Sequence, residues 1–272
     1  MTMPLDYCAG RLPASLKATR QGEVGVLWLT RGGTLDDETI LGIETYFSTL
    51  AGIIKTVVLA SEGEDLCLGL AVSAARKEDT IESLARALSR QRSFERIQFG
   101  KVPVVAVLRG AVIGAGLELA AAAHVRVAER SAYYKLGEGL GQVPGGCVGL
   151  TRLIGPSRVM DMMLTGRAYS AEEGQTMGLS TYLVNNGSGV AKGLALADTI
   201  ARNRPIANCS AMHLLPRVAM DPAAGHVAEE LVAALARLES QAAEQRATDD
   251  SGTVSSLGSA FADGHSCKDR RG

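Results

Sequence analysis

A glycine-rich stretch between an apolar run and a helix-like run constrains the fold most strongly. Residues 102–108 have the length and composition of a buried strand, and residues 117–123 are typical of a helix. A glycine turn at a helix start exposes backbone N–H groups, which can bind negative charge. Glu118 falls within the first turn of this helix. The stretch therefore predicts backbone donors for an anion beside a possible acid or base.

Strand-like and helix-like segments alternate through the first half of the chain. The expected strands are residues 24–29, 55–60, 102–108 and 124–128. The expected helices between them are residues 36–50 and 78–99. Alternation of this kind predicts an α/β domain in which many strands pair in parallel.

The pattern becomes mostly helical after Pro144. Helices are expected at residues 157–164, 190–203 and 226–246, with a short strand at 181–184. Ser170 and Glu173 have the spacing of a capping box at a helix start. From Thr248 the composition shifts to Ser, Gly, Asp and Arg, which is typical of disorder. We therefore predict a core at 1–200, a helical region at 201–247 and a disordered tail at 248–272.

Composition excludes several classes of partner. The formal net charge is −1, which gives no reason to expect nucleic acid or an anionic membrane as partner. Charged residues interrupt every apolar run well before about 18 residues accumulate, so neither a membrane span nor a signal peptide is expected. The five cysteines are scattered, which predicts free thiols in a reducing compartment, the cytoplasm. The four histidines lack ligand spacing, so no metal site is expected.

Five short blocks, in order along the chain, resemble motifs of the crotonase superfamily, the enoyl-CoA hydratases and isomerases. The blocks are residues 64–70, 101–110 and 114–120, then Gly137-Glu138 with 144–146, and 164–166 followed by Ala171 and 178–179. The resemblance extends over roughly residues 24–246. It implies a spiral of ββα units followed by a helical C-terminal region.

The resemblance also implies an activity. It is the hydration of a 2-enoyl-CoA thioester to a 3-hydroxyacyl-CoA, with no metal or redox cofactor, because coenzyme A is part of the substrate. Family members assemble as trimers or dimers of trimers, so a homo-oligomer of this kind is expected. Alternatives on the same fold are double-bond isomerisation and cleavage of an aromatic enoyl-CoA by a hydratase–lyase. An accessory homologue that binds acyl-CoA without turnover is a further alternative.

Site residues follow from the matched positions. The oxyanion donors fall on the backbone N–H groups of Leu70 and Ala115, and the two acids on Glu118 and Glu138. The resemblance further implies substrate contacts at Leu66, Leu68 and Gly114. In this interpretation the glutamates share a water: one takes its proton while the other protonates the α-carbon. Two carboxylates in an apolar pocket repel each other and lose hydration, so one could stay protonated as the acid.

Other interpretations of the same residues remain open. Glu118 could be a solvated carboxylate that complements the helix dipole. The loop between Glu138 and Pro144 is one residue shorter than in typical hydratases, which motivates the accessory alternative. Gly114 and Gly116 could begin a dinucleotide fingerprint, although its third glycine is replaced by Leu119. Four arginines could form a solvated helix face or bind coenzyme A phosphates. They are Arg86, Arg90, Arg92 and Arg96.

Overall fold

The fold is described from a computed structural model, which describes residues 3–4, 12–30, 33–71, 80–136, 147–218 and 237. The chain divides into two compact units, Met1–His213 and Leu214–Gly272. Every strand of the described residues belongs to the first unit. Of the second unit, only the end of helix α8 (Pro205–Val218) and Arg237 are described.

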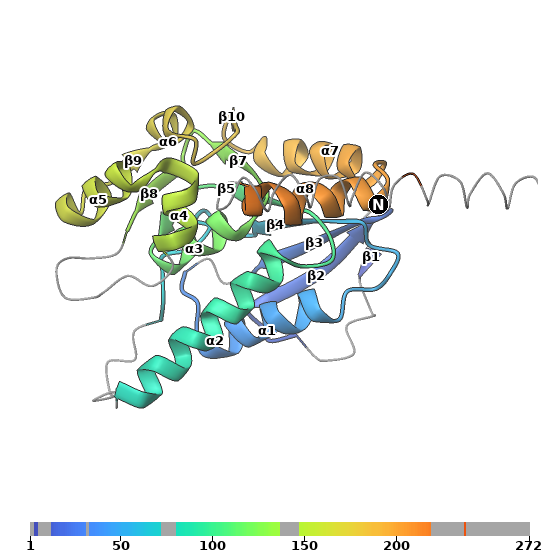
Figure 1. The fold of residues 1–272 in the computed structure, drawn as a ribbon, viewed down its shortest axis with the longest axis horizontal. Helices are drawn as coiled ribbons and strands as arrows, with labels where there is room; N and C mark the ends of the chain where they lie inside the picture. The colour runs from blue at the N-terminus through green and yellow to red at the C-terminus, as the bar shows by residue number, and fades with distance from the viewer. Residues whose placement is uncertain are drawn as a thin grey trace, which may run out of the picture. The chain divides into compact units, whose positions relative to one another are not determined.

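A seven-stranded sheet forms the centre of the first unit (Figure 1). Its strand order is β1-β2-β3-β4-β5-β7-β10. The bounds are β1 (Met3–Pro4), β2 (Leu16–Gln21), β3 (Val24–Leu29), β4 (Thr56–Ser61), β5 (Val104–Leu108), β7 (Val125–Glu129) and β10 (Tyr182–Val184). The pairs β1–β2 and β2–β3 are antiparallel, whereas every pair from β3 to β10 is parallel. The predicted α/β class with parallel pairing is therefore confirmed.

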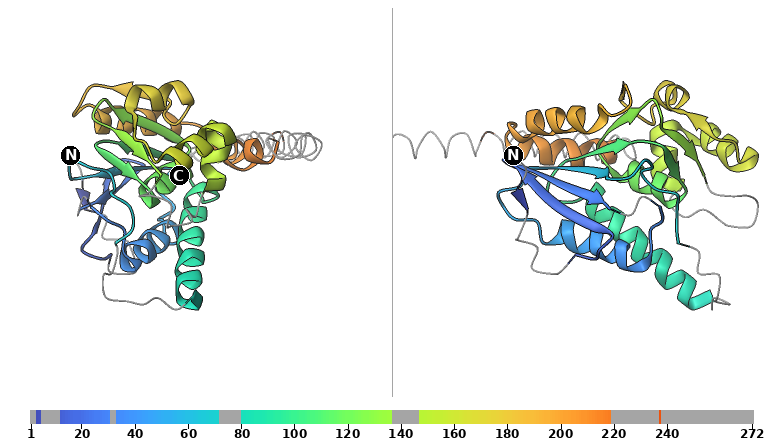
Figure 2. Two further views of the ribbon diagram at one scale, coloured as in Figure 1. Left: turned by 90° about the vertical axis from the view of Figure 1, so that its left-hand side faces the viewer. Right: turned by 180° about the vertical axis from the view of Figure 1, so that it is seen from behind.

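Side chains of the parallel strands alternate between two apolar layers. In β4, Val57 and Leu59 face the larger core while Val58 and Ala60 face the smaller one. Helices α1 (Asp37–Ser48) and α2 (Thr80–Gln98) pack on the larger core (Figure 1). Helix α7 (Gly189–Ala201) covers the opposite face of the sheet, as the rear view also shows (Figure 2). Because both faces are covered, the strands are continuous apolar runs, as the sequence predicts.

A second, three-stranded sheet lies beside the first, in the order β6-β8-β9. Its strands are β6 (Ala111–Ile113), β8 (Tyr133–Lys135) and β9 (Tyr169–Ser170). The helices around it are α3 (Ala115–Ala122), α4 (Cys147–Ile154), α5 (Pro156–Thr165) and α6 (Ala171–Met177). All eight residues of α3 are buried, Glu118 included. A glutamate inside a fully buried helix needs a specific explanation, because burial disfavours its charged form.

Most expected elements are present, with shifts of a few residues at their ends. The capping box at α6 is confirmed: the Ser170 hydroxyl accepts from the Glu173 N–H, and Glu173 accepts from the Ser170 N–H. Two expectations need correction. The stretch 110–116 is not all turn, since it contains β6, which pairs with β8. No individual helix is expected at 205–218, yet the structure has α8 there, and Pro205 begins it because proline fits the first position of a helix.

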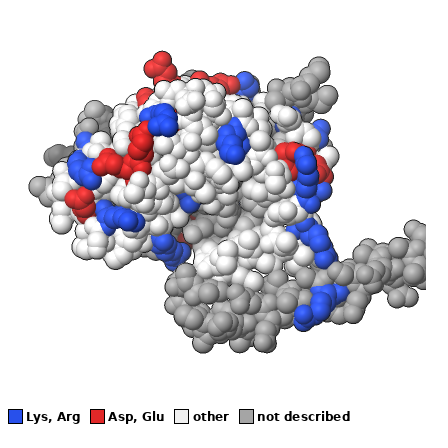
Figure 3. All heavy atoms as spheres, turned by 90° about the horizontal axis from the view of Figure 1, so that it is seen from above, with Lys and Arg blue, Asp and Glu red and all other residues white. Residues whose placement is uncertain are grey.

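The C-terminal predictions are largely untested. The expected helix at 226–246 lies outside the described residues except for Arg237, and the expected tail at 248–272 lies wholly outside them. The division into core, helical region and tail therefore stays a prediction. Within the described residues, no helix combines the length and hydrophobicity that a membrane crossing requires. Charges of both signs are scattered among uncharged residues on the face drawn in Figure 3.

Candidate active site

Two chain segments run side by side where β4 and β5 end. The Leu66 N–H donates to the Arg109 carbonyl at 2.8 Å, and the Cys67 N–H donates to the Ala111 carbonyl at 3.0 Å. The Ile113 N–H returns a bond to the Cys67 carbonyl at 2.9 Å. In open α/β sheets, ligands bind beyond the carboxyl ends of parallel strands. The predicted oxyanion residues Leu70 and Ala115 follow directly on these two segments.

Glycines allow the two segments to approach each other. Gly110 has φ +50°, and a Cβ there would lie 2.3 Å from the Asp65 Oδ1. That same Asp65 oxygen accepts from the Ala111 N–H at 2.7 Å. A Cβ on Gly116 would lie 2.5 Å from the Cys67 Cβ. Any side chain at either glycine would therefore push the segments apart.

The backbone around Leu70 leaves its N–H without an acceptor among the residues that the structure describes. The Leu35 N–H donates to the Gly69 carbonyl at 2.8 Å, and the Ala71 N–H donates to the Leu35 carbonyl at 2.9 Å. In this parallel bridge the groups on either side of Leu70 bond to Leu35, so the N–H of Leu70 itself points the opposite way. Among the described residues, none accepts a hydrogen bond from it.

Ala115 presents a second N–H, at the start of α3, that meets no acceptor in the described part of the chain. The Gly114 carbonyl accepts from the N–H groups of Leu117 and Glu118, at 3.0 and 3.1 Å. The Ala115 N–H is the first of the helix and has no intrahelical acceptor. A Cβ on Gly114, at φ +52°, would lie 3.9 Å from the Gly69 Cα. The two bare donors thus belong to adjoining segments, at the positive end of a helix.

Glu118 is buried and paired with an arginine. Its exposed fraction is 9%, and its Oε2 accepts from the Arg90 Nε at 3.3 Å. Burial raises the pKa of Glu118 to about 7, although the nearby Arg90 charge acts to lower it. The hypothesis of a solvated carboxylate at the helix start is therefore wrong. A carboxyl group with a pKa near neutrality can either give or take a proton.

Of the remaining predicted site residues, the structure describes Leu66, Leu68 and Gly114 but not Glu138. Leu66 is buried in the larger core, whereas Leu68 is partly exposed on the same segment as Leu70. Gly114 lies between β6 and α3. Glu138, the second predicted acid, lies outside the described residues, as does the short loop that follows it. The pairing of two glutamates therefore stays a prediction.

The sequence names Arg90 only as one of four arginines on a helix and does not connect it with Glu118, which the structure does. The Arg90 side chain is 12% exposed and comes from α2. A signal was available, because Arg90 stands three and four positions before the buried Ser93 and Phe94, on the same helix face. Arg86 instead pairs with Asp37 and Glu82, at 3.3 and 2.7 Å. The four arginines therefore do not form one uniform solvated face.

Two other titratable residues are structural. Glu129 accepts from the Gly189 N–H at 2.9 Å and pairs with Arg109 at 3.4 Å, which leaves it no role as a ribose-binding acid. His124 accepts from the Val104 N–H at 3.0 Å, and burial lowers its pKa to about 4. In the part of the chain that the structure describes, no cluster of three or more His, Cys, Asp or Glu residues could hold a metal.

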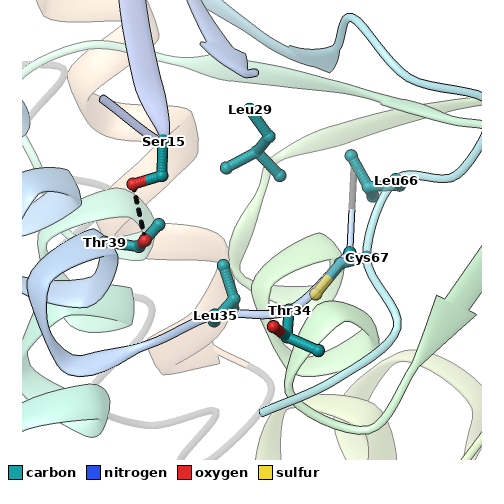
Figure 4. A pocket seen from close by; sticks show the side chains of 8 residues that line it. Ser15, Leu29, Thr34, Leu35, Thr39, Leu66 and Cys67 are labelled. Atoms are coloured by element: carbon teal, nitrogen blue, oxygen red, sulfur yellow. Dashed lines mark hydrogen bonds between the residues drawn. The ribbon is translucent and has the colours of Figure 1, made fainter. Parts of the chain in front are cut away.

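A small cavity lies beside the segment that carries Leu66 and Cys67 (Figure 4). Leu35, Leu66 and Cys67 line it together with Ser15 and Thr39, whose hydroxyls are 2.7 Å apart. Its volume is about 10 Å³, the space of a single water. The cavity is therefore too small for an acyl chain and belongs to the packing around Leu35, the β-bridge partner of Leu70.

Comparison with known proteins identifies the family. The sequence profile described as enoyl-CoA hydratase/isomerase matches residues 24–247. The enoyl-CoA hydratase EchA19 of Mycobacterium tuberculosis is 30% identical over 160 residues, or 57% of this chain and 60% of that protein. The mevalonyl-coenzyme A hydratase SIDH of Beauveria bassiana is 32% identical over 164 residues, or 56% of this chain and 59% of that protein. The alignments thus span less than two thirds of these curated relatives.

Solved structures agree over a larger share of the chain. A protein of Rhodopseudomonas palustris, described as a candidate enoyl-CoA hydratase, is 40% identical with a TM-score of 0.81, covering 91% of this chain and 100% of that one. A candidate enoyl-CoA hydratase of Thermobifida fusca, in complex with acetoacetyl-CoA, is 26% identical with a TM-score of 0.75, covering 83% and 95%. The chain belongs to the enoyl-CoA hydratase/isomerase family of the crotonase superfamily.

Proposed function

We propose that this protein hydrates a 2-enoyl-CoA thioester to a 3-hydroxyacyl-CoA. The observation that carries the proposal is a buried glutamate with a pKa of about 7, next to a helix start whose first N–H has no acceptor among the described residues. Hydration needs both elements. Charge develops on the thioester oxygen when water adds, and a proton must leave that water. The solved Thermobifida fusca relative binds acetoacetyl-CoA, a thioester of the same kind.

The oxyanion is assigned to the N–H groups of Leu70 and Ala115. Both are backbone donors, so their geometry depends on the glycine-lined segments and not on their own side chains. Loss of one such donor typically raises the barrier by about 2.7–4 kcal/mol. The partly exposed Leu68 and the backbone at Gly114 would contact the thioester from either side.

The proton transfers are assigned to Glu118 and Glu138. A water held between them adds its oxygen to the β-carbon while the α-carbon gains a proton. No electrons are exchanged in this addition, so the reaction needs no redox cofactor, and in this proposal the two backbone N–H groups stabilise the oxyanion in place of a metal. We further propose that the protein works in the cytoplasm as a homotrimer or a dimer of trimers, as expected from the family.

Hydratase activity can be tested by following the loss of enoyl absorbance with crotonyl-CoA and with a cinnamoyl-type CoA. The proposal predicts turnover of at least one substrate and a 3-hydroxyacyl-CoA product that carries oxygen from labelled water. Absence of turnover with both would contradict it and favour an acyl-CoA-binding homologue.

The variant E138Q separates hydration from a reaction with a single acid. If Glu138 shares the water, E138Q should lower kcat by about 10²-fold or more. Wild-type hydration by E138Q would remove Glu138 from the mechanism. Activity that needs Glu118 alone would instead favour double-bond isomerisation.

A further inference from the structure

Arg90 and Glu118 form an ion pair that is largely hidden from water. The Arg90 Nε lies 3.3 Å from the Glu118 Oε2, and the side chains are 12% and 8% exposed. The pair joins α2 to α3, the buried helix that begins at the oxyanion donor Ala115. This ion pair differs from an exposed surface salt bridge, because both charged groups have lost most of their hydration.

The pair joins a single nitrogen of Arg90, Nε, to a single oxygen of Glu118, Oε2. Within the described residues, the second oxygen of Glu118 accepts no hydrogen bond, and Arg90 makes no contact with another acid. The contact therefore fixes one oxygen of the carboxylate and leaves the other available.

We propose that Arg90 is a positioning residue, which holds one oxygen of Glu118 and keeps the carboxylate charged so that the other oxygen can take a proton from the substrate water. The inference rests on the proposed hydratase function and assigns to Glu118 the role of base. Arg90 itself acts through Glu118 and need not touch the acyl group.

The electrostatic balance supports this assignment. Burial raises the pKa of Glu118, and the charge and hydrogen bond of Arg90 both lower it, with a result of about 7. The elements packed on α3 are α2, α4 and β6. Helix α4 contributes the Cys147 thiol, whose pKa is raised by burial and then by the Glu118 charge. Strand β6 carries no titratable side chain. Among the described residues, Arg90 is thus the cation that faces Glu118.

Removal of the cation should raise the pKa of Glu118. An adjacent opposite charge typically displaces a carboxyl pKa by about 1–3 units. In R90M the acid limb of the kcat/KM profile should therefore move upward by about 1–3 pH units. At pH 7 the rate should fall about fivefold or more and recover at high pH, with kcat affected more than KM. R90K keeps the charge without the planar fork and should retain the wild-type midpoint.

The matched control is R92M, which removes an exposed arginine from the same helix and should leave the midpoint unchanged. R90Q provides a second neutral variant if R90M folds poorly. An unchanged acid limb in R90M and R90Q, with rates reduced equally at every pH, would assign Arg90 to helix packing alone and overturn the proposal.

A titration without substrate separates this proposal from the proposed function. With carboxyl-labelled glutamate, the ¹³C resonance that disappears in E118Q reports the Glu118 titration directly. The midpoint should lie near 7 in wild type and in R92M, and about 1–3 units higher in R90M. Equal midpoints in wild type and R90M would overturn the role of Arg90. Absence of enoyl-CoA turnover, with the midpoint shift present, would instead contradict the hydratase function only.

Discussion

Glu118 and Glu129 are two buried glutamates of the same domain, and each lies beside an arginine. Glu129 uses both carboxylate oxygens, on the Gly189 N–H and on Arg109, and it is 1% exposed. Glu118 meets only Arg90 among the described residues, through one oxygen. The difference distinguishes a carboxylate that holds α7 to the sheet from one that retains the capacity to bind and react.

Replacement of Glu118 should give the largest effect on activity. E118Q keeps the shape of the side chain but cannot take a proton, so kcat should fall by about 10²–10⁴-fold. Enoyl-CoA hydration by purified protein, checked for folding by circular dichroism, measures the change. A kcat within threefold of wild type would mean that Glu118 has no catalytic role.

Replacement of Glu129 should affect stability instead. E129A leaves the Gly189 N–H and the Arg109 guanidinium without their partner, which should lower the free energy of unfolding by about 3–5 kcal/mol. Urea unfolding measures the loss, while kcat per folded molecule should stay near wild type. A stable E129A with low kcat would mean that the two glutamates are not functionally distinct.

The pH dependence of stability sharpens the contrast. The pKa of Glu118 is raised from 4.5 to about 7 in the folded protein, so its stabilising contribution is present below pH 4.5 and is lost as pH rises toward 7. E118Q lacks this loss, and its stability relative to wild type should increase by roughly 3 kcal/mol over that range. The lowered pKa of His124 makes stability change with pH in the opposite direction, but it does so equally in wild type and in E118Q. The contribution of His124 therefore cancels in the difference between the two proteins. A constant difference between the unfolding curves would contradict the raised pKa.

The glycines that bring the two segments together allow a smaller, matched test. Gly110 and Gly22 have similar φ values, +50° and +60°, but only Gly110 has neighbours that a Cβ would meet. G22A should lose stability through backbone strain alone. G110A should lower the free energy of unfolding by about 1–3 kcal/mol more than G22A, and it should lose most of its enzymatic activity. Unfolding and kinetic measurements on both variants would show the difference. Equal behaviour would mean that close approach at Gly110 is unimportant.

Sequence patterns predicted the parallel sheet well because strands covered on both faces are continuous apolar runs, as in β4 and β5. Strand β6 was missed because three residues carry no periodicity, and its pairing with β8 depends on residues distant in sequence. Leu70 and Ala115 were assigned by resemblance alone, since a backbone N–H leaves no signature in its own side chain.

Helix α3 is apolar on every side except Glu118, which indicates burial, but its sequence does not show which cation meets the carboxylate. Its partner Arg90 lies 28 positions earlier, and no local spacing connects the two. Helical periodicity in α2 does place Arg90 on the face of Phe94 and Ile97, but it does not indicate what that face meets. Long-range contact is therefore the part of the site that only the structure reveals.

A crystal structure with bound acetoacetyl-CoA tests the central claim most directly. The account predicts that the thioester oxygen lies about 2.7–3.1 Å from the backbone nitrogens of both Leu70 and Ala115. The free oxygen of Glu118 should face the acyl carbons while its other oxygen stays on Arg90. A thioester oxygen bound away from both nitrogens, with Glu118 remote from the acyl group, would contradict the account.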